Sequence, residues 1–127
     1  MEDLIEKLAL SNGLIVEFWD RSGRDKWGLW TVHLFVKSTV FIKEEYFSDL
    51  TDSQREYQKA LNTFGNEIIY TYEKTKTHVL EEDRTAVFNR ITHRFKDVAI
   101  NYLSREDFPK RFIRKELYFP STKASLP

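Results

Sequence analysis

Residues 4–20 read LIEKLALSNGLIVEFWD, and this stretch decides the fold because Asn12-Gly13 lies between two apolar runs. Asn-Gly between runs rich in β-branched and aromatic residues is the strongest short-range signal for a β-hairpin. A third apolar run, Trp27 to Ile42, follows Arg21-Ser22-Gly23-Arg24, which we interpret as a second turn. The chain is therefore predicted to open with three antiparallel strands.

Alternate residues of the third strand divide into two faces. The first face is more apolar and is predicted to form the core; it holds Trp30, Val32, Leu34, Val36 and Ser38. The opposite face, which includes Leu29, His33 and Phe35, is predicted to stay uncovered.

The rest of the chain is predicted to form helix, strand and helix. Thr51 and Gln54 have the spacing of a capping box at the start of a short helix, and Gly65 occupies its expected stop. Period-two alternation over residues 66–79 predicts a fourth strand. A long amphipathic helix is predicted from about Glu82 to Leu103. Its apolar stripe, expected to lie on the sheet, consists of Val87, Ile91, Phe95, Val98 and Tyr102.

These elements predict an α+β fold with a mostly antiparallel four-stranded sheet, in the order β-β-β-α-β-α. The long helix packs on one face, and a basic-aromatic C-terminal segment follows Phe108-Pro109. With 127 residues and no internal repeat or linker, residues 1–120 are predicted to form a single domain, and residues 121–127 a frayed tail.

Charge is unevenly distributed along a chain whose formal net charge is zero. From Arg84 onward there are ten basic and four acidic residues, a formal charge of +6. Such asymmetry indicates either a solvated helix face or an anionic partner. Overall neutrality disfavours a dedicated nucleic-acid binder, because those domains usually have a high pI.

Composition also excludes several classes of site. The chain has no cysteine, which fits a reducing compartment, and we expect a cytoplasmic protein with no membrane span. Its three histidines have no metal-ligand spacing, and its four glycines form neither a dinucleotide fingerprint nor a phosphate loop. We therefore expect neither a metal nor a cofactor.

The leading functional hypothesis is a non-enzymatic interaction or accessory domain that forms a homodimer or contacts another protein. Aromatic and basic side chains together often anchor partners, which makes Trp19, Trp27, Arg111, Phe112 and Arg114 the candidate contacts. The apolar residues of the C-terminal segment pack on their own sheet, on a second subunit or on an acidic partner. The uncovered sheet face is a further surface for a symmetric dimer.

Two alternatives remain open. The first is binding of an anion or nucleic acid through the basic C-terminal third; its candidate residues are Arg90, Arg94, Arg111, Arg114 and Lys115. The second is a small acid/base or metal-dependent enzyme that uses the acidic cluster Glu17, Asp20 and Asp25, or His33. No residue is assigned as catalytic.

Several short motifs also carry a resemblance. They are Leu10-Ser11-Asn12-Gly13-Leu14, Glu17-Phe18-Trp19-Asp20-Arg21-Ser22, Asp25-Lys26-Trp27, Tyr102-Leu103-Ser104 and Phe108-Pro109. Together they resemble a group of small uncharacterised bacterial proteins that share an LSNGLxxEFxD-type opening and an FP near the end. The resemblance implies a bacterial cytoplasmic domain and transfers no activity or catalytic residue.

Overall fold

The computed structural model describes residues 2–120 and confirms the α+β fold class. The described residues divide into two compact units, residues 2–38 with 70–105 and residues 39–69 with 106–120. The single domain over residues 1–120 stays a prediction, and the predicted frayed tail lies outside the described residues. No helix within residues 2–120 combines the length and apolarity needed to cross a membrane.

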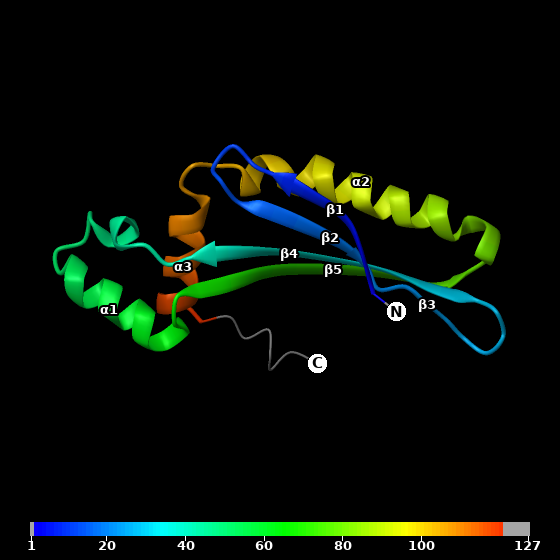
Figure 1. The fold of residues 1–127 in the computed structure, drawn as a ribbon, viewed down its shortest axis with the longest axis horizontal. Coiled ribbons are helices and arrows are strands. Elements are labelled where there is room, and N and C mark those ends of the chain that lie inside the picture. The colour runs from blue at the N-terminus through cyan, green and yellow to red at the C-terminus, as the bar shows by residue number, and fades with distance from the viewer. Residues whose placement is uncertain (1, 121–127) are drawn as a thin grey trace. The chain divides into compact units, whose positions relative to one another are not determined.

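The sheet contains the four predicted strands and one short additional strand (Figure 1). These are β1 (Asp3–Ala9), β2 (Ile15–Asp20), β3 (Gly23–Arg24), β4 (Trp30–Phe41) and β5 (Glu67–Val79). Strand β2 pairs antiparallel with β1 and β4, while β3 and β5 also pair with β4. Strands β1 and β5 are therefore the long edge strands of the sheet.

Strands β2 and β3 pair with the same side of β4 in one register. The pairs Asp20–Leu34 and Gly23–Thr31 share one register, and between them the Arg21 N–H donates to the His33 carbonyl at 2.9 Å. The turn predicted at Arg21–Arg24 is therefore wrong, because Arg21 and Ser22 join β2 to β3 along β4 without reversing the chain.

The two hairpins turn through loops of the same kind, each with three residues and glycine in third place. In Ser11-Asn12-Gly13 the Gly13 N–H donates to the Leu10 carbonyl at 3.0 Å, and in Lys26-Trp27-Gly28 the Gly28 N–H donates to Asp25 at 3.1 Å. Gly13 and Gly28 have φ of 93° and 85°, which a side chain would strain. The predicted Asn-Gly hairpin is confirmed, with the glycine closing a three-residue loop.

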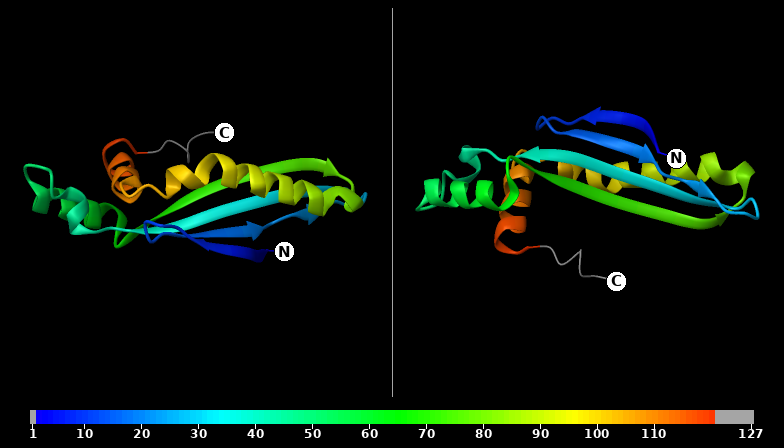
Figure 2. Two further views of the ribbon diagram at one scale, coloured as in Figure 1. Left: turned by 90° about the horizontal axis from the view of Figure 1, so that it is seen from above. Right: turned by 60° about the horizontal axis from the view of Figure 1, so that its bottom comes forward.

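Helix α2 (Arg84–Leu103), which follows a 3-10 turn η2 (Glu81–Asp83), lies along one face of the sheet (Figure 2). The predicted core face of β4 is confirmed at Val32, Leu34, Val36 and Ser38, which are buried, whereas Trp30 at the start of the strand is half-buried. The Ser38 hydroxyl donates to the Ile15 carbonyl at 2.9 Å, so this polar side chain is hydrogen-bonded inside the core.

The buried face of α2 differs from the predicted stripe. Val87 and Phe95 are buried as expected, but Val98 is 71% and Tyr102 49% exposed. The residues buried in addition to Val87 and Phe95 are Phe88, Thr92 and Leu103. The predicted stripe is wrong at its C-terminal end because α2 carries apolar residues outside the face that packs on the sheet as well as on that face.

The Asn12 side chain joins the first hairpin to the C-terminal end of α2. Its amide nitrogen donates to the carbonyls of Leu103 at 2.7 Å and Arg105 at 2.8 Å, and its Oδ1 accepts from the Leu14 N–H at 3.1 Å. The last carbonyls of a helix lack partners within the helix. Asn12 therefore provides part of the C-terminal cap of α2 from about ninety residues away in sequence.

The second unit contains a 3-10 turn η1 (Glu44–Phe47) and helices α1 (Ser53–Phe64) and α3 (Phe108–Tyr118). The predicted stop at Gly65 is confirmed, with φ of 79° and its N–H donating to Leu61 at 2.8 Å. The capping box is wrong: no side chain caps α1, and the Gln54 amide donates to the carboxylate of Glu44.

The C-terminal basic-aromatic segment is largely a third helix, which the sequence pattern did not predict. Pro109 lies in the first turn of α3, where a missing N–H costs nothing, so it starts a helix rather than ending one. Helix α3 packs against α1 and η1, and Ile113 and Leu117 are buried.

Replacing Asn12 by alanine should lower the free energy of unfolding by about 2 kcal/mol, because three hydrogen bonds are lost and the carbonyls of Leu103 and Arg105 lose a partner. Ser11→Ala is the matched control, since the exposed Ser11 hydroxyl makes one long 3.3 Å bond to Ser104. We expect the control to lose less than about 0.5 kcal/mol in urea denaturation. Equal losses in the two variants would contradict the role assigned to Asn12.

Two alanine substitutions on α2 test which residues meet the sheet. Phe95→Ala should cost about 3–5 kcal/mol, because the ring is 4% exposed and its removal leaves a cavity. Val98→Ala, on the exposed side of the same helix, should change stability by less than about 0.5 kcal/mol. A large loss of stability for Val98→Ala in urea denaturation would contradict the exposed position of Val98 and support the predicted stripe.

Candidate functional site

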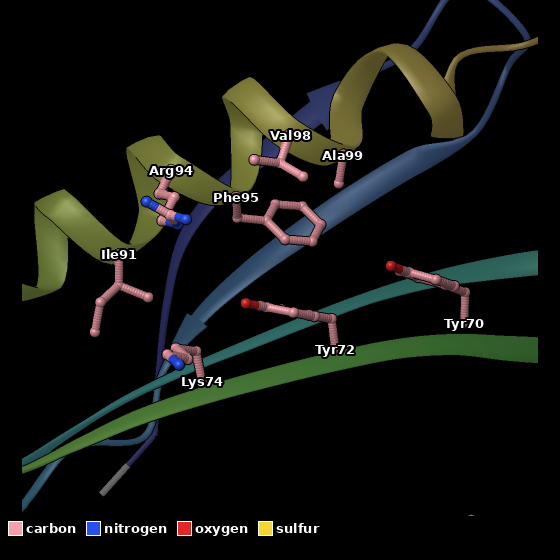
Figure 3. Close-up of a pocket in the computed structure, with 8 residues that line it drawn as sticks. All are labelled: Tyr70, Tyr72, Lys74, Ile91, Arg94, Phe95, Val98 and Ala99. Carbon is pink, nitrogen blue, oxygen red and sulfur yellow. The ribbon is translucent and has the colours of Figure 1, made fainter.

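A groove in the first unit runs between edge strand β5 and helix α2. We define this β5–α2 groove by two hollows. The first has a volume of about 360 Å³ and is lined by Tyr70, Tyr72, Lys74, Ile91, Arg94, Phe95, Val98 and Ala99 (Figure 3). The second has a volume of about 420 Å³ and is lined by Lys76, His78, Val79, Leu80, Asp83, Ala86, Val87 and Arg90.

Strand and helix periodicity bring these side chains together. Alternate residues of β5 from Tyr70 to His78 point to the face that α2 occupies, because strand side chains alternate between faces. Arg90 and Arg94 are four residues apart on α2 and therefore share one side of the helix. The hollows succeed each other along both elements, with one lysine from β5 and one arginine from α2 in each.

The four cations of the groove are exposed and have no carboxylate partner among the described residues. Within residues 2–120, no ion pair involves Lys74, Lys76, Arg90 or Arg94. The lysine and arginine side chains that form ion pairs in that part of the chain are Arg21, Arg24, Lys37, Arg84, Lys96, Lys110, Arg111 and Arg114. The groove therefore gathers positive charge that the rest of the described chain does not neutralise.

The first hollow combines this charge with aromatic surface. The Tyr72 ring packs on Phe95 with centroids 4.7 Å apart and planes at 41°. Figure 3 shows Lys74 and Arg94 at the end where Ile91 lies, with Val98 and Ala99 toward Tyr70. Burial raises the pKa of Tyr70 above its usual 10, and the neighbouring phenols of Tyr102 and Tyr72 raise it further. The Tyr70 hydroxyl is therefore neutral at physiological pH.

The second hollow contains an unusual backbone position. His78 has φ of 58°, the left-handed region, and no other non-glycine residue within residues 2–120 has positive φ. Residues held in sparsely populated backbone regions cluster at functional sites. His78 is exposed and lines the hollow beside Lys76 and Arg90.

Of the predicted partner contacts, Trp19 and Trp27 lie outside the groove. Trp19 is half-buried on β2, where its Nε1 donates to Glu17 at 2.8 Å. Trp27, in the second hairpin loop, is 76% exposed, with the Lys26 ammonium 4.6 Å from its ring. The structure does not bring these two residues into one site.

The predicted contacts on α3 are engaged within the second unit. Arg114 pairs with Asp49 at 3.2 Å, and Arg111 pairs with Asp107 at 3.2 Å. The Phe112 ring stacks on Phe108 with centroids 5.6 Å apart. Lys115 is exposed, and within residues 2–120 it forms no ion pair. Three of the four cations of α3 thus have a carboxylate partner, with Asp49 shared by Lys110 and Arg114.

The sheet face opposite α2 is covered in part by its own charged side chains. The Arg21 guanidinium lies 3.6 Å from the Phe35 ring centroid, and Arg21 also pairs with Glu73 at 3.6 Å. His33, the candidate histidine, contacts the same Glu73 carboxylate at 3.3 Å. Leu29, Phe35 and His33 are half-buried, so this face is less open than the sequence predicted.

The predicted acidic cluster is dispersed. Glu17 binds the Trp19 indole, whereas Asp20 accepts from the Ser22 N–H at 2.9 Å and lies 3.9 Å from Arg84 of α2. Asp25 accepts from the N–H groups of its own hairpin loop, as turn aspartates do. Across residues 2–120, no three histidine or acidic side chains are grouped so that they could hold a metal ion.

Sequence reasoning found Arg90 and Arg94 but missed the residues of β5 that face them. A signal was present: from Tyr70 to His78 every second residue is aromatic or basic, in the pattern Y-x-Y-x-K-x-K-x-H. Period-two patterning identifies one face of a strand. It does not show which helix covers that face.

Comparisons with known proteins bring no further assignment to the groove. No family model, no curated protein and no solved structure matches the chain. The resemblance to small bacterial proteins stays a prediction, and the functional conclusion depends on the geometry alone.

Proposed function

We propose that this chain is a non-enzymatic binding protein whose β5–α2 groove holds an anionic ligand. The observation that carries the proposal is the convergence of Lys74, Lys76, Arg90 and Arg94 on one groove without carboxylate partners among the described residues. This develops the anion-binding alternative, with Arg90 and Arg94 retained and the α3 cations replaced by the two lysines of β5.

The arrangement of these charges has an energetic cost in the absence of a ligand. Like charges four residues apart on a helix, or adjacent on one strand face, repel each other. The chain contains twenty acidic residues, yet of the residues that line the two hollows only Asp83 is acidic. A bound anion would remove this repulsion, and the walls of a groove focus the positive potential on it.

The first hollow also favours an apolar group on the ligand. Its volume of about 360 Å³ falls within the range of small-molecule sites, about 300–1,000 Å³. Ile91, Phe95, Val98 and Ala99 provide apolar walls beside the Lys74 and Arg94 cations. The best match is an anion that carries an apolar or aromatic group.

Self-association stays a second proposal, supported by the exposed Trp27. A tryptophan that is 76% exposed at the tip of a hairpin is a typical anchor for a protein contact. Light scattering tests it: the wild type should have the mass of a dimer and Trp27→Ser that of a monomer. A monomeric wild type would remove this proposal. A cytoplasmic location in a bacterium likewise stays a prediction from the sequence.

Reversing one groove charge tests the anion site. Arg94→Glu should weaken binding of inorganic tripolyphosphate at least tenfold, because a charged hydrogen bond is replaced by repulsion. Arg55→Glu is the matched control, since Arg55 is exposed on α1 and forms no ion pair within residues 2–120. Isothermal titration calorimetry at low salt gives both affinities. Equal weakening by the two variants, or no binding by the wild type, would contradict the proposal.

A further inference from the structure

We infer that the anion of the β5–α2 groove is the backbone of a single-stranded nucleic acid, an inference that rests on the proposed function. The groove combines repeated cations with aromatic and apolar surface along one line. Nonspecific single-strand binders use the same combination, a positive groove that follows the backbone and aromatic side chains that stack on bases.

The cations form a repeat rather than a cluster. Lys74 and Lys76 are two residues apart on a strand, about 6.6 Å along its axis. Arg90 and Arg94 are one helical turn apart, about 6 Å along theirs. The spacing of the two lysines nearly equals that of the two arginines, and each lysine lines the same hollow as one arginine. Two lysine–arginine pairs in succession fit a linear polymer with regularly spaced negative charges better than a compact anion.

The groove is also long enough for a chain molecule. The β5 residues that line it extend from Tyr70 to His78, about 26 Å along the strand. The α2 residues that line it extend from Ala86 to Ala99, about 20 Å at the helical rise. A lipid headgroup would occupy one of the two cation pairs and leave the other without a partner.

The aromatic end distinguishes a nucleic acid from an inorganic polyphosphate. The half-buried Tyr72 ring lines the same hollow as the first cation pair and, with the exposed Val98, offers apolar surface to a base, whereas an inorganic polyphosphate has no group that would use this surface. A duplex keeps its bases stacked inside and cannot present them to this surface. The formal net charge of zero provides no general attraction to either single strands or duplexes, so affinity depends on the groove itself.

Fluorescence anisotropy with a fluorescein-labelled oligo(dT) of about 12 nucleotides, a length typical of single-strand sites, tests the inference on the full chain. The single strand should bind at least tenfold tighter than its duplex with oligo(dA). Four phosphate contacts predict a slope of log K against log salt of about −3, and Lys76→Ala should reduce its magnitude by about 0.7. Oligo(U) measured alongside shows whether RNA or DNA is preferred.

A matched pair of substitutions tests the stacking surface. Tyr72→Leu removes the ring and should weaken oligo(dT) about tenfold while leaving tripolyphosphate unchanged. Tyr72→Phe keeps the ring and should stay within twofold of the wild type. Because Tyr72 packs on Phe95, circular dichroism first confirms that both variants are folded. If Tyr72→Leu does not fold, the single-strand preference and the salt slope decide the inference.

The outcomes separate this inference from the proposed function. Suppose that tripolyphosphate binds and Arg94→Glu abolishes that binding. If oligo(dT) then binds no tighter than its duplex, or binds Tyr72→Leu as tightly as the wild type, the single-strand inference is overturned and the anion site stands. If neither tripolyphosphate nor oligo(dT) binds the wild type, both are overturned.

Discussion

The Phe95 ring makes the contact on which both the core and the groove depend. It packs edge-on against Phe18 of β2, with centroids 5.8 Å apart, and its other aromatic neighbour is Tyr72 of β5. A helix with its side chains is about 10–12 Å wide, whereas strands lie about 4.8 Å apart, so one helix covers about two strands. With α2 seated on Phe18, the inner face of β5 is left as the wall of a groove.

The basic residues of α2 have different neighbours at the two edges of the sheet. Beside β1, the Lys96 ammonium pairs with Glu6 at 2.6 Å and lies 5.2 Å from the Phe18 ring centroid, which covers that side of the core. Beside β5, Arg90 and Arg94 have lysines opposite them instead of acids. The same helix thus neutralises its charge at one edge and accumulates it at the other, which is the basis of the proposed function.

The sequence predicted local structure better than it predicted the site. The Asn12-Gly13 hairpin and the stop at Gly65 follow from backbone requirements that neighbouring residues reveal. The exposure of Val98 depends on how wide a strip of sheet one helix covers. Helix α3 has Pro109 in its first turn, and the sequence pattern does not show whether a proline ends one helix or lies in the first turn of the next. The groove was not predictable because Lys74 and Arg94 meet only after β5 and α2 have packed. The hydrophobic periodicity of each segment does not show which strand packs beside which helix.

The most direct test is an NMR titration of the full, ¹⁵N-labelled chain with inorganic tripolyphosphate, with assigned backbone amides. Chemical-shift changes should concentrate on β5 from Tyr70 to His78 and on α2 around Arg90 and Arg94, and should fade with added salt. Changes confined to α3 or to the opposite sheet face around Trp19, or none at all, would contradict the assignment of an anion site to the β5–α2 groove.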